Sequence, residues 1–492
     1  MSGAHNGHAG SADIGSRSEP LSDELTALNC PYTAEDCKMA VVGGALVAPA
    51  KGSTAAAGEL DSNSTAGTPN VPPARSAGVR GVAEKVFSVI PHGGLIANIY
   101  NLASATLGAG IVSVPSGFHQ SGMVVSVVLL VVVCACTIYS IRLLGQAKLK
   151  TGLRSYEEMA RGMLGRGWDY FAAFLMFMFC WGTCVGYVIS VGDLLSPMLD
   201  GPNTNAFLKT PNGHRILVGL IWFVGMFTLS LPKEINSLRY ASVVGVSFVI
   251  FFVICMIIHS AQNGLKNGVR SDVKLINHGM PAVNGLTLFI FAFICQVNVF
   301  EIFDEMARPT LRNMTRDATV SMVVVAVLNF FSGFFGYCDF GSDVDGSILL
   351  LYRPIEEPLF MIAYIGICVK LCVGFAICIQ PSRDAIYYCL QMGKTSDVKD
   401  WLNWIVSGFL ALAALICGLF IPNINIVFSL LGGICGGFLG FMFPAYFFIY
   451  SGGFTLAKVG ILNYIGCLIL IVGGVVAVVF GTAVAIYGEI PE

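Results

Sequence analysis

Residues 96–115 read IANIYNLASATLGAGIVSVP, an apolar stretch with two close glycines, Gly108 and Gly110, followed by Pro115. The stretch is long enough to cross a hydrocarbon core of about 30 Å as a helix. Glycine and proline weaken a helix, and a break at membrane depth is tolerated only where it lines protein or a water-filled cavity. The stretch therefore predicts a membrane-spanning helix that is interrupted near its centre.

The rest of the chain has the composition of a membrane protein. Of 492 residues, 55% are hydrophobic and 12% are charged, whereas soluble domains carry about 25% charged residues. The mean hydropathy is +0.74. The 28 Lys and Arg nearly balance the 30 Asp and Glu, so the chain has no basic field of the kind that binds nucleic acid. We expect a polytopic protein whose surroundings are a lipid bilayer, and no nucleic-acid partner.

Eleven apolar segments of roughly membrane-spanning length follow one another from residue 94 onward. They cover residues 94–118, 121–144, 169–192, 215–232, 239–260, 281–304, 317–337, 358–381, 402–420, 424–450 and 460–485. We therefore expect an all-α protein with about 11 transmembrane helices in residues 91–487 and a short extracytoplasmic C-terminus, residues 488–492. Residues 1–90 are rich in Gly, Ala, Ser and Pro, which predicts a disordered cytoplasmic tail without a cleavable signal peptide.

The loops predict an orientation and an internal repeat. Eighteen Lys and Arg fall on the side of the N-terminus and six on the other side, which predicts a cytoplasmic N-terminus. About 24 residues join segments 2 and 3 and about 20 join segments 7 and 8, while links 4–5 and 9–10 are both short. This pattern is typical of a five-plus-five inverted repeat with one extra helix, an architecture of secondary transporters.

Cysteine and histidine positions argue against disulfides, metals and enzymes. Most of the 16 cysteines lie inside apolar runs, where we expect them to be small buried hydrophobes. Twelve belong to this group: Cys134, Cys136, Cys180, Cys184, Cys255, Cys295, Cys368, Cys372, Cys378, Cys417, Cys435 and Cys467. The seven histidines lie in the tail or near the ends of segments, so no haem or metal constellation forms. We expect no catalytic chemistry and no bound cofactor.

A broken first span is a candidate site for a zwitterion. Its broken ends expose N–H groups that can hold a carboxylate and carbonyls that can hold an ammonium. The alternative is helix packing, because closely spaced glycines also let membrane helices approach one another. On the residues of this span alone, both interpretations stay open.

The stretch Asn101–Pro115, with its Gly-Ala-Gly-Ile, resembles the first-helix signature of the amino acid/auxin permease family. The segment Phe291–Gln296 is similar to that family, and Ser155–Glu158 with Gln296–Ile302 most resembles its trypanosomatid amino acid permeases. The resemblance covers about residues 90–485. It implies a leucine-transporter-type fold with substrate between helices 1 and 6 and contacts from helices 3 and 8. It favours the site interpretation, with substrate contacts in the first span at Thr106, Gly108, Ala109, Gly110 and Ile111.

The sixth span adds three polar candidates. No Gly or Pro occurs between Leu286 and Ala307, so helix breakers do not force an unwound centre. The amides of Gln296 and Asn298 can satisfy a freed backbone or a bound solute, or simply join helices by hydrogen bonds. Glu301 is an acid inside an apolar span, where a charge is costly and faces a cavity or a partner. We predict substrate contacts at all three residues.

Lys370 is the one Lys or Arg near the centre of a predicted span. Its ammonium must reach a cavity, pair with an acid such as Glu301, or lose its proton. The eighth span carries no Ser or Thr from Leu359 through Pro381, whereas related folds use hydroxyls there to bind sodium. We therefore predict Lys370 and Glu301 as coupling residues, with protons rather than sodium as the coupled ion.

These observations predict an amino acid permease of the plasma membrane that works by alternating access. Glu301 favours a cationic substrate, arginine or lysine. Permeation of neutral amino acids (proline or alanine) or polyamines, and an amino acid sensor on the same fold, remain alternatives.

Overall fold

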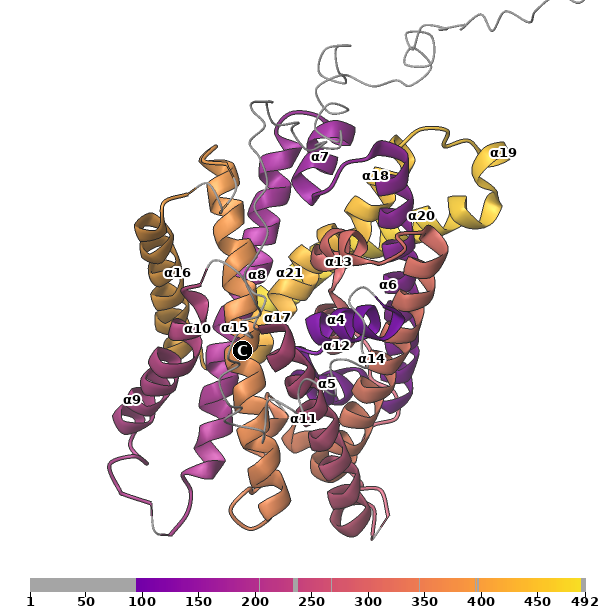
Figure 1. The fold of residues 1–492 in the computed structure, drawn as a ribbon. Helices are drawn as coiled ribbons and strands as arrows, with labels where there is room; N and C mark the ends of the chain where they lie inside the picture. Colours follow the sequence, from indigo (N-terminus) through magenta and orange to yellow (C-terminus); the bar gives the residue numbers. More distant parts are fainter. Residues whose placement is uncertain are drawn as a thin grey trace, which may run out of the picture. The chain divides into compact units, whose positions relative to one another are not determined.

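The computed structural model describes residues 94–487, except residues 203, 233–237, 267, 345, 394, 396 and 397. The predicted disordered tail, residues 1–90, and the predicted extracytoplasmic C-terminus, residues 488–492, lie outside the described residues. Regular structure in the described part of the chain is entirely helical (Figure 1). This agrees with the predicted all-α class.

The first five spans run from α4 to η2. They are α4 (Leu95–Thr106) with α5 (Gly110–Ser121), α6 (Met123–Thr151), α8 (Trp168–Met198), α9 (Pro211–Ile221) with η1 (Trp222–Phe227) and α10 (Thr228–Ser230), and α11 (Leu238–His259) with η2 (Ser260–Gly264). The short helix α7 (Tyr156–Leu164) connects α6 to α8.

The next six spans run from α12 to α21. They are α12 (Met280–Phe293) with η3 (Gln296–Asn298) and α13 (Val299–Glu305), α14 (Leu311–Phe340), α15 (Pro358–Cys389), α16 (Asp400–Phe420), α17 (Ile424–Leu430) with η7 (Leu431–Met442) and α18 (Phe443–Tyr450), and α20 (Ile461–Val476) with η8 (Ala477–Gly481) and α21 (Thr482–Tyr487). Short connecting helices are η4 (Gly341–Asp343), η5 (Ile348–Leu350) and α19 (Leu456–Val459).

The number of spans agrees with the sequence. Within the described residues, ten helices are long and apolar enough to cross a membrane, and the bent pair α4 and α5 makes an eleventh. Several helices extend past the predicted ends: α6 continues to Thr151, α14 begins at Leu311 and α15 continues to Cys389. Hydropathy detects only the part of a helix that lies in hydrocarbon, whereas the helix itself continues into the polar region.

Local sequence sets several helix ends. The side chains of Ser155, Thr210 and Thr310 accept hydrogen bonds from the first-turn N–H groups of α7, α9 and α14. Such caps satisfy donors that have no partner inside the helix. The helix α6 ends at Gly152, which has a φ of 74° and an N–H that donates to the carbonyl of Lys148 at 2.8 Å. Glycine adopts this left-handed conformation without strain.

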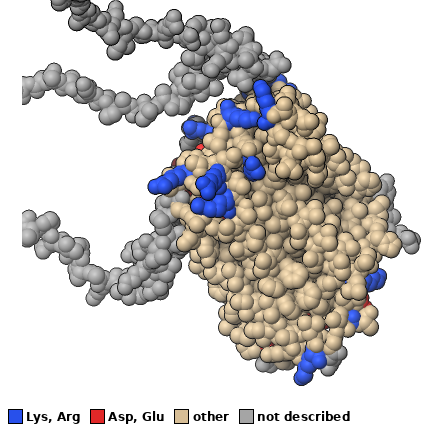
Figure 2. Space-filling model, turned by 90° about the vertical axis from the view of Figure 1, so that its right-hand side faces the viewer, with Lys and Arg blue, Asp and Glu red and all other residues tan. Residues whose placement is uncertain are grey.

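One face of the molecule carries a belt with almost no charges. In the face drawn in Figure 2, Lys and Arg gather toward the two ends of the molecule and the surface between them carries almost none. Large apolar side chains are exposed on the membrane-spanning helices, among them Phe223 of η1, Phe409 of α16 and Leu468 of α20. Exposed apolar surface of this extent is unusual for a protein in water and is typical of contact with lipid.

The inner helices position the site. The pair α8 and α15 packs along its length, and α12 packs on α5 and η7 (Figure 1). In contrast, α9, α16 and α20 expose much of their surface. Of the twelve cysteines predicted as small buried hydrophobes, eight are buried and the other four are partly buried. Side chains on the inner helices are therefore held from several sides.

Candidate functional site

The first span breaks at the two glycines. The helix α4 ends at Thr106 and α5 begins at Gly110, and the two axes differ by 60°. A Cβ atom at Gly108 would lie 2.7 Å from the hydroxyl oxygen of Tyr187, and one at Gly110 would lie 3.0 Å from the Cα of Ala292. The first distance is shorter than real Cβ contacts, and the second is tight enough that the Ala292 backbone would have to shift. The glycines therefore let the broken backbone approach α8 and α12.

The break leaves backbone groups free to bind a solute. The Gly108 N–H donates to the carbonyl of Thr106 at 2.8 Å, and the Thr106 hydroxyl donates to the carbonyl of Leu102 at 2.7 Å. Among the described residues, the N–H groups of Ala109, Gly110 and Ile111 have no backbone acceptor. Together with the positive end of the α5 dipole, they form a place for an anionic group.

The sixth span also breaks, although it contains no glycine or proline there. The helix α12 ends at Phe293, and Ile294 is extended with ψ 112°. The Gln296 amide holds the break: Oε1 accepts from the Cys295 N–H at 3.0 Å, and Nε2 donates to the Ser140 hydroxyl at 2.9 Å. Because this side chain satisfies the freed backbone, the span can unwind without a helix breaker. The two interrupted spans, the first and the sixth, match the predicted inverted repeat.

A cavity of about 230 Å³ lies between the two breaks. Its walls come from α4 and α5, from α8, from the α12–α13 span and from α15. The residues that line it are Asn101, Ser104, Ala105, Thr106, Gly108, Ala109, Gly110, Phe179, Cys180, Thr183, Tyr187, Phe291, Ile294, Val297, Asn298, Glu301, Ile302, Glu305, Lys370, Gly374, Ile377, Cys378 and Pro381. A cavity of this size, with mixed apolar and polar walls, suits a small amphipathic solute.

The structure gathers most of the predicted site residues in this cavity. Thr106, Gly108, Ala109, Gly110, Asn298, Glu301 and Lys370 line it. Ile111 and Gln296 do not belong to the lining, and both are almost fully buried. The structure therefore places Gln296 behind the wall as a support of the break. The substrate contacts of the lining residues remain predictions.

Lys370 connects α15 to the broken first span. Its Nζ donates to the Ser104 carbonyl at 3.1 Å and to the Ser104 hydroxyl at 2.8 Å, and the residue is 3% exposed. Among the described ion pairs, none joins Lys370 to Glu301. The alternative that Lys370 pairs with Glu301 is therefore not the arrangement found. Instead, Lys370 holds the C-terminal end of α4.

Glu301 lies on the exposed side of α13 and faces the cavity. No hydrogen bond or ion pair is found for its carboxylate within the described part of the chain. The carboxylates of Asp384, Glu305, Glu157 and Asp304 lie close enough to affect it electrostatically. The mouth of the cavity on the α13 side is therefore acidic.

Two further contacts hold α13 and α4 at this mouth. Lys148 is 7% exposed, and its Nζ lies 2.8 Å from Asp304 and donates to the carbonyl of Phe300 at 3.0 Å. The Asn98 amide donates to the carboxylate of Asp317 at 3.0 Å. The first contact joins α6 to α13 and the second joins α4 to α14. The half-helices at the mouth are thus attached to their neighbours by polar contacts.

Sequence reasoning missed the contribution of the third span. Tyr187 and Thr183 of α8 line the cavity, and a Cβ at either Gly108 or Gly374 would collide with the Tyr187 ring. The resemblance implied a contact from helix 3 but pointed to no particular residue, because a tyrosine and a threonine in an apolar run do not stand out in the sequence. Ser104 was also missed, because its role depends on a lysine 266 residues away.

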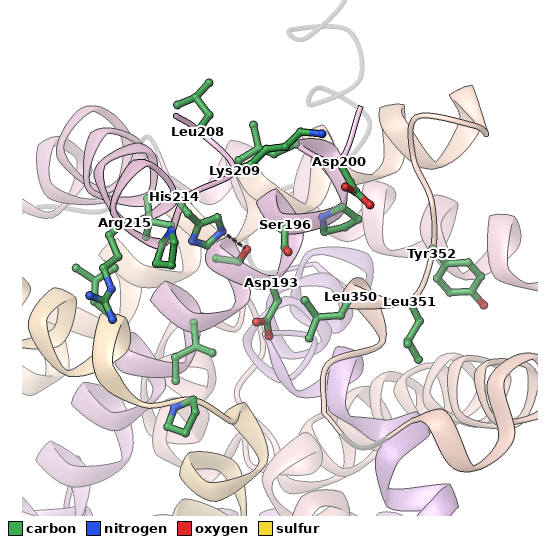
Figure 3. A pocket seen from close by; sticks show the side chains of 18 of the residues that line it. Asp193, Ser196, Asp200, Leu208, Lys209, His214, Arg215, Leu350, Leu351 and Tyr352 are labelled. Atoms are coloured by element: carbon green, nitrogen blue, oxygen red, sulfur yellow. Dashed lines mark hydrogen bonds between the residues drawn. The ribbon is translucent and has the colours of Figure 1, made fainter. Parts of the chain in front are cut away.

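A second, larger cavity of about 1000 Å³ lies beside the C-terminal half of α8, between α9, the end of α16 and the loop before α15 (Figure 3). Asp193, Lys209, His214 and Arg215 face it, and His214 Nε2 lies 3.0 Å from the carbonyl of Gly192. Its lining includes no residue of α4, α5, α12 or α13. It is therefore separate from the broken helices and is not the candidate substrate site.

A family model described as transmembrane amino acid transporter protein matches residues 92–487. The chain belongs to this family. The match covers every span described above, so the expected amino acid permease family is confirmed. The similarity thus extends over all the membrane spans and is not confined to one motif.

Curated relatives of this transporter are themselves amino acid transporters. Vacuolar amino acid transporter 6 of Saccharomyces cerevisiae is 27% identical over 311 residues, 61% of this chain and 67% of that protein. Sodium-coupled neutral amino acid transporter 7 of Homo sapiens is 24% identical over 370 residues, 70% of this chain and 77% of that protein. Vacuolar amino acid transporter 5 of Schizosaccharomyces pombe is 23% identical over 371 residues, 74% of this chain and 86% of that protein.

Proposed function

We propose that this transporter carries cationic amino acids, arginine or lysine, by alternating access, with the cavity between the broken helices as the substrate site. The observation that supports the charge of the substrate is the Glu301 carboxylate. It lines the cavity without a cationic partner among the described residues, at a mouth where other acids gather. A carboxylate in such a position attracts a guanidinium or an ammonium.

The amino acid backbone fits the first break. Its carboxylate would accept hydrogen bonds from the N–H groups of Gly110 and Ile111 at the start of α5. Its ammonium would lie toward the carbonyls that end α4. In this orientation the side chain extends toward α13, where Asn298 and Glu301 line the cavity. One bound amino acid would thus contact the breaks of both the first and the sixth span.

Proton coupling is proposed for Lys370. When charged, its ammonium holds α15 to the end of α4 through Ser104. When neutral, it would keep only weaker hydrogen bonds and release α4. Loss and gain of one proton would therefore change the packing between the first and eighth spans.

A second candidate substrate is a neutral amino acid. It is favoured by Phe179, Phe291 and Ile294, which give the cavity an apolar wall, and by relatives whose names specify neutral substrates and sodium coupling. The absence of Ser and Thr between Leu359 and Pro381 of the eighth span speaks against the usual sodium site.

The plasma membrane remains the proposed location, with a vacuolar membrane as the alternative because two of the relatives are named vacuolar. A fluorescent fusion imaged beside markers of the two membranes separates these locations. Labelling confined to the vacuolar membrane would contradict the plasma-membrane proposal.

The substrate proposal is tested by competition in a transport-deficient cell with labelled arginine. Unlabelled lysine should compete, while proline, alanine and putrescine should compete poorly. In Glu301→Gln, we expect arginine affinity to fall by about 1–3 kcal/mol, the range of a charge-assisted hydrogen bond. Residual neutral uptake should change much less.

The control is Glu356→Gln, because Glu356 is an exposed acid that pairs with Arg353 and lies outside the substrate cavity. Equal losses for cationic and neutral substrates in Glu301→Gln would assign Glu301 to gating or coupling. Uptake of labelled amino acid into liposomes that contain the purified chain separates a carrier from a sensor.

A further inference from the structure

The loop before α15 packs on two of the helices that line the substrate cavity. Residues 346–357 contain η5, which contacts both α5 and α8. Ile348, Leu349 and Tyr352 of this loop are at most 1% exposed. The Tyr364 hydroxyl donates to the carbonyl of Leu349 at 2.7 Å. Because the loop packs on α5 and α8, which line the substrate cavity, its movement would change how these helices are held on that side.

A histidine joins this loop to two other spans. His259 of α11 lies with Nδ1 3.1 Å from Oδ2 of Asp339, on α14, and with Nε2 3.3 Å from Oε1 of Glu357, which precedes α15. The Tyr352 hydroxyl donates to the same Asp339 oxygen at 2.9 Å. The Tyr352 ring stands edge-on to the imidazole with centroids 5.1 Å apart. These four side chains, the His259 cluster, tie the loop to α11 and α14.

The chemistry of the cluster requires a proton. A neutral imidazole carries one N–H, so it can donate to only one acceptor, and its other nitrogen presents a lone pair. In the His259 cluster, both ring nitrogens face carboxylate oxygens. A lone pair against a carboxylate is repulsive, so the arrangement is satisfied only when the imidazole is charged or an acid is protonated. The geometry thus describes a site for one proton.

The neighbouring charged groups do not supply this proton. Arg270 donates to the backbone carbonyl of Asp339 and pairs with Asp272 and Asp343. The N–H of Ser342 and the Arg270 guanidinium lower the pKa of Asp272 to about 2, so it stays charged near neutral pH. The other rings against His259, those of Phe340 and Phe360, carry no charge. Titration between about pH 5 and 8 therefore falls on the His259 cluster itself.

Loss of the proton would break one contact before the other. The Asp339 side chain is 1% exposed and is held also by Tyr352, whereas the Glu357 side chain is 41% exposed. A neutral His259 keeps its hydrogen bond to Asp339, and Glu357 turns to water at lower cost. Glu357 is the link to the start of α15. Its release would loosen the loop at that end.

We propose that His259, Asp339 and Glu357 form a proton-binding site that locks the loop of residues 346–357 when protonated and releases it when the proton is lost to the solution on that side. Acid on this side would thus hold the transporter closed there, and a higher pH would favour opening. The proposal rests on the alternating access proposed above, but it concerns a proton site separate from Lys370.

The test measures exposure of the loop without relying on transport. Ser347 is a loop residue that is 2% exposed, so a thiol there becomes reactive only when the loop moves, and Ser347→Cys changes little in volume. In the full-length chain in liposomes, a membrane-impermeant thiol reagent is added at about pH 5.5 and about pH 7.5 on the loop side. The parent chain, treated in the same way, gives the background from its own cysteines. A free thiol in solution gives the intrinsic pH dependence of the reaction, because only the thiolate reacts.

After this correction, we expect modification to be at least about fivefold faster at the higher pH. A factor of about five is at the lower end of the range that is typical for coupling between two sites. Adding His259→Gln should give fast modification at both pH values, and adding Glu357→Gln should also flatten the profile. The matched control is His278→Gln, an exposed histidine of a neighbouring loop, which should keep the parent profile.

Two outcomes would overturn the proposal. One is a corrected rate for Ser347→Cys that does not depend on pH, and the other is an unchanged pH dependence after His259→Gln. The substrate and coupling proposals survive either outcome, because Lys370→Met and Glu301→Gln are read by transport. If His259→Gln fails to fold, as judged by gel filtration, Glu357→Gln decides the question, since its side chain is partly exposed.

Discussion

At the scale of single residues, the proposed substrate site depends most on two glycines and one lysine. Gly108 and Gly110 allow the backbone of the first span to approach Tyr187 and Ala292. Lys370 reaches across from α15 to the end of the same broken helix. Each of these residues is small or charged where an ordinary membrane helix would carry an aliphatic side chain. Substitution of these residues should therefore change transport more than it changes folding.

Gly108→Val should abolish uptake while leaving much of the protein at the membrane. The added Cβ would meet the Tyr187 hydroxyl, and the branched side chain would fill the place of the bound solute. The measurement is uptake normalised to the amount of protein in the membrane. Gly473→Val is the control, because Gly473 is a helical glycine with no atom near its Cβ position. Normal transport by Gly108→Val would remove the first break from the substrate site. Gly432→Val, where the Cβ would meet the backbone of Thr287, should instead impair folding.

Lys370→Met should allow exchange of substrate across the membrane but remove its dependence on pH. The methionine fills a similar space without a proton, so the contact with Ser104 no longer changes with pH. Lys370→Arg should stay charged and hold α4 at all pH values. Exchange in liposomes is measured while the pH is varied on the α13 side alone. An unchanged pH profile in Lys370→Met, or accumulation that requires sodium, would contradict proton coupling through Lys370.

At the scale of elements, the two broken spans are held open by different means. The first span breaks because glycine weakens the helix, whereas the sixth is held by the Gln296 side chain. A substitution at Gln296 should thus act on the element as a whole. Each substrate would be affected, because the position of α13 changes with the break.

Gln296→Leu should lower the thermal stability of the purified protein, because it leaves the buried Cys295 N–H without its acceptor and removes the donor to the Ser140 oxygen, whose hydroxyl keeps its bond to the Thr137 carbonyl. Each buried unsatisfied group costs about 1–3 kcal/mol. The melting temperature in detergent is the measurement. Comparison of Gln296→Ala, Ser140→Ala and the double variant gives the coupling energy between the two side chains. Additive effects would show that their 2.9 Å hydrogen bond contributes little.

At the scale of the whole molecule, the helices form one bundle with a cavity that opens beside α13 and a loop that covers the opposite side. The distribution of Lys and Arg in the loops predicts that the α13 side is cytoplasmic. The cavity beside α13 and the packed loop of residues 346–357 on the other side would then describe a transporter that is open to the cytoplasm. This orientation is a prediction and can be measured directly.

An epitope placed at the N-terminus should be reached by antibody only after the membrane is permeabilised, whereas an epitope at the C-terminus should be reached without permeabilisation. The physical reason is the excess of Lys and Arg in the loops on the N-terminal side, since such loops are retained in the cytoplasm. The chain should carry no glycan at Asn313, which begins the seventh span on that side. Direct labelling of an N-terminal epitope in intact cells would reverse the orientation.

Much of this architecture is encoded locally. Apolar segments of sufficient length predict the spans, because each membrane helix must satisfy its own backbone and face lipid. The first break follows from Gly108 and Gly110, and the cost of a charge in hydrocarbon draws attention to Lys370 and Glu301. These properties depend on composition and short-range order. They were therefore accessible before any tertiary contact was known.

The tertiary structure decided which of these residues face the cavity and which partners they have. Gln296 was expected at the substrate and lies behind the wall, because its amide is drawn to a backbone N–H and to Ser140, 156 residues away. Lys370 contacts Ser104 rather than Glu301, and Tyr187 faces the break. His259 meets Asp339 and Glu357 only when three spans come together. Such contacts join residues that are far apart in the chain, and no local pattern specifies them, since their energies arise only after the helices have packed.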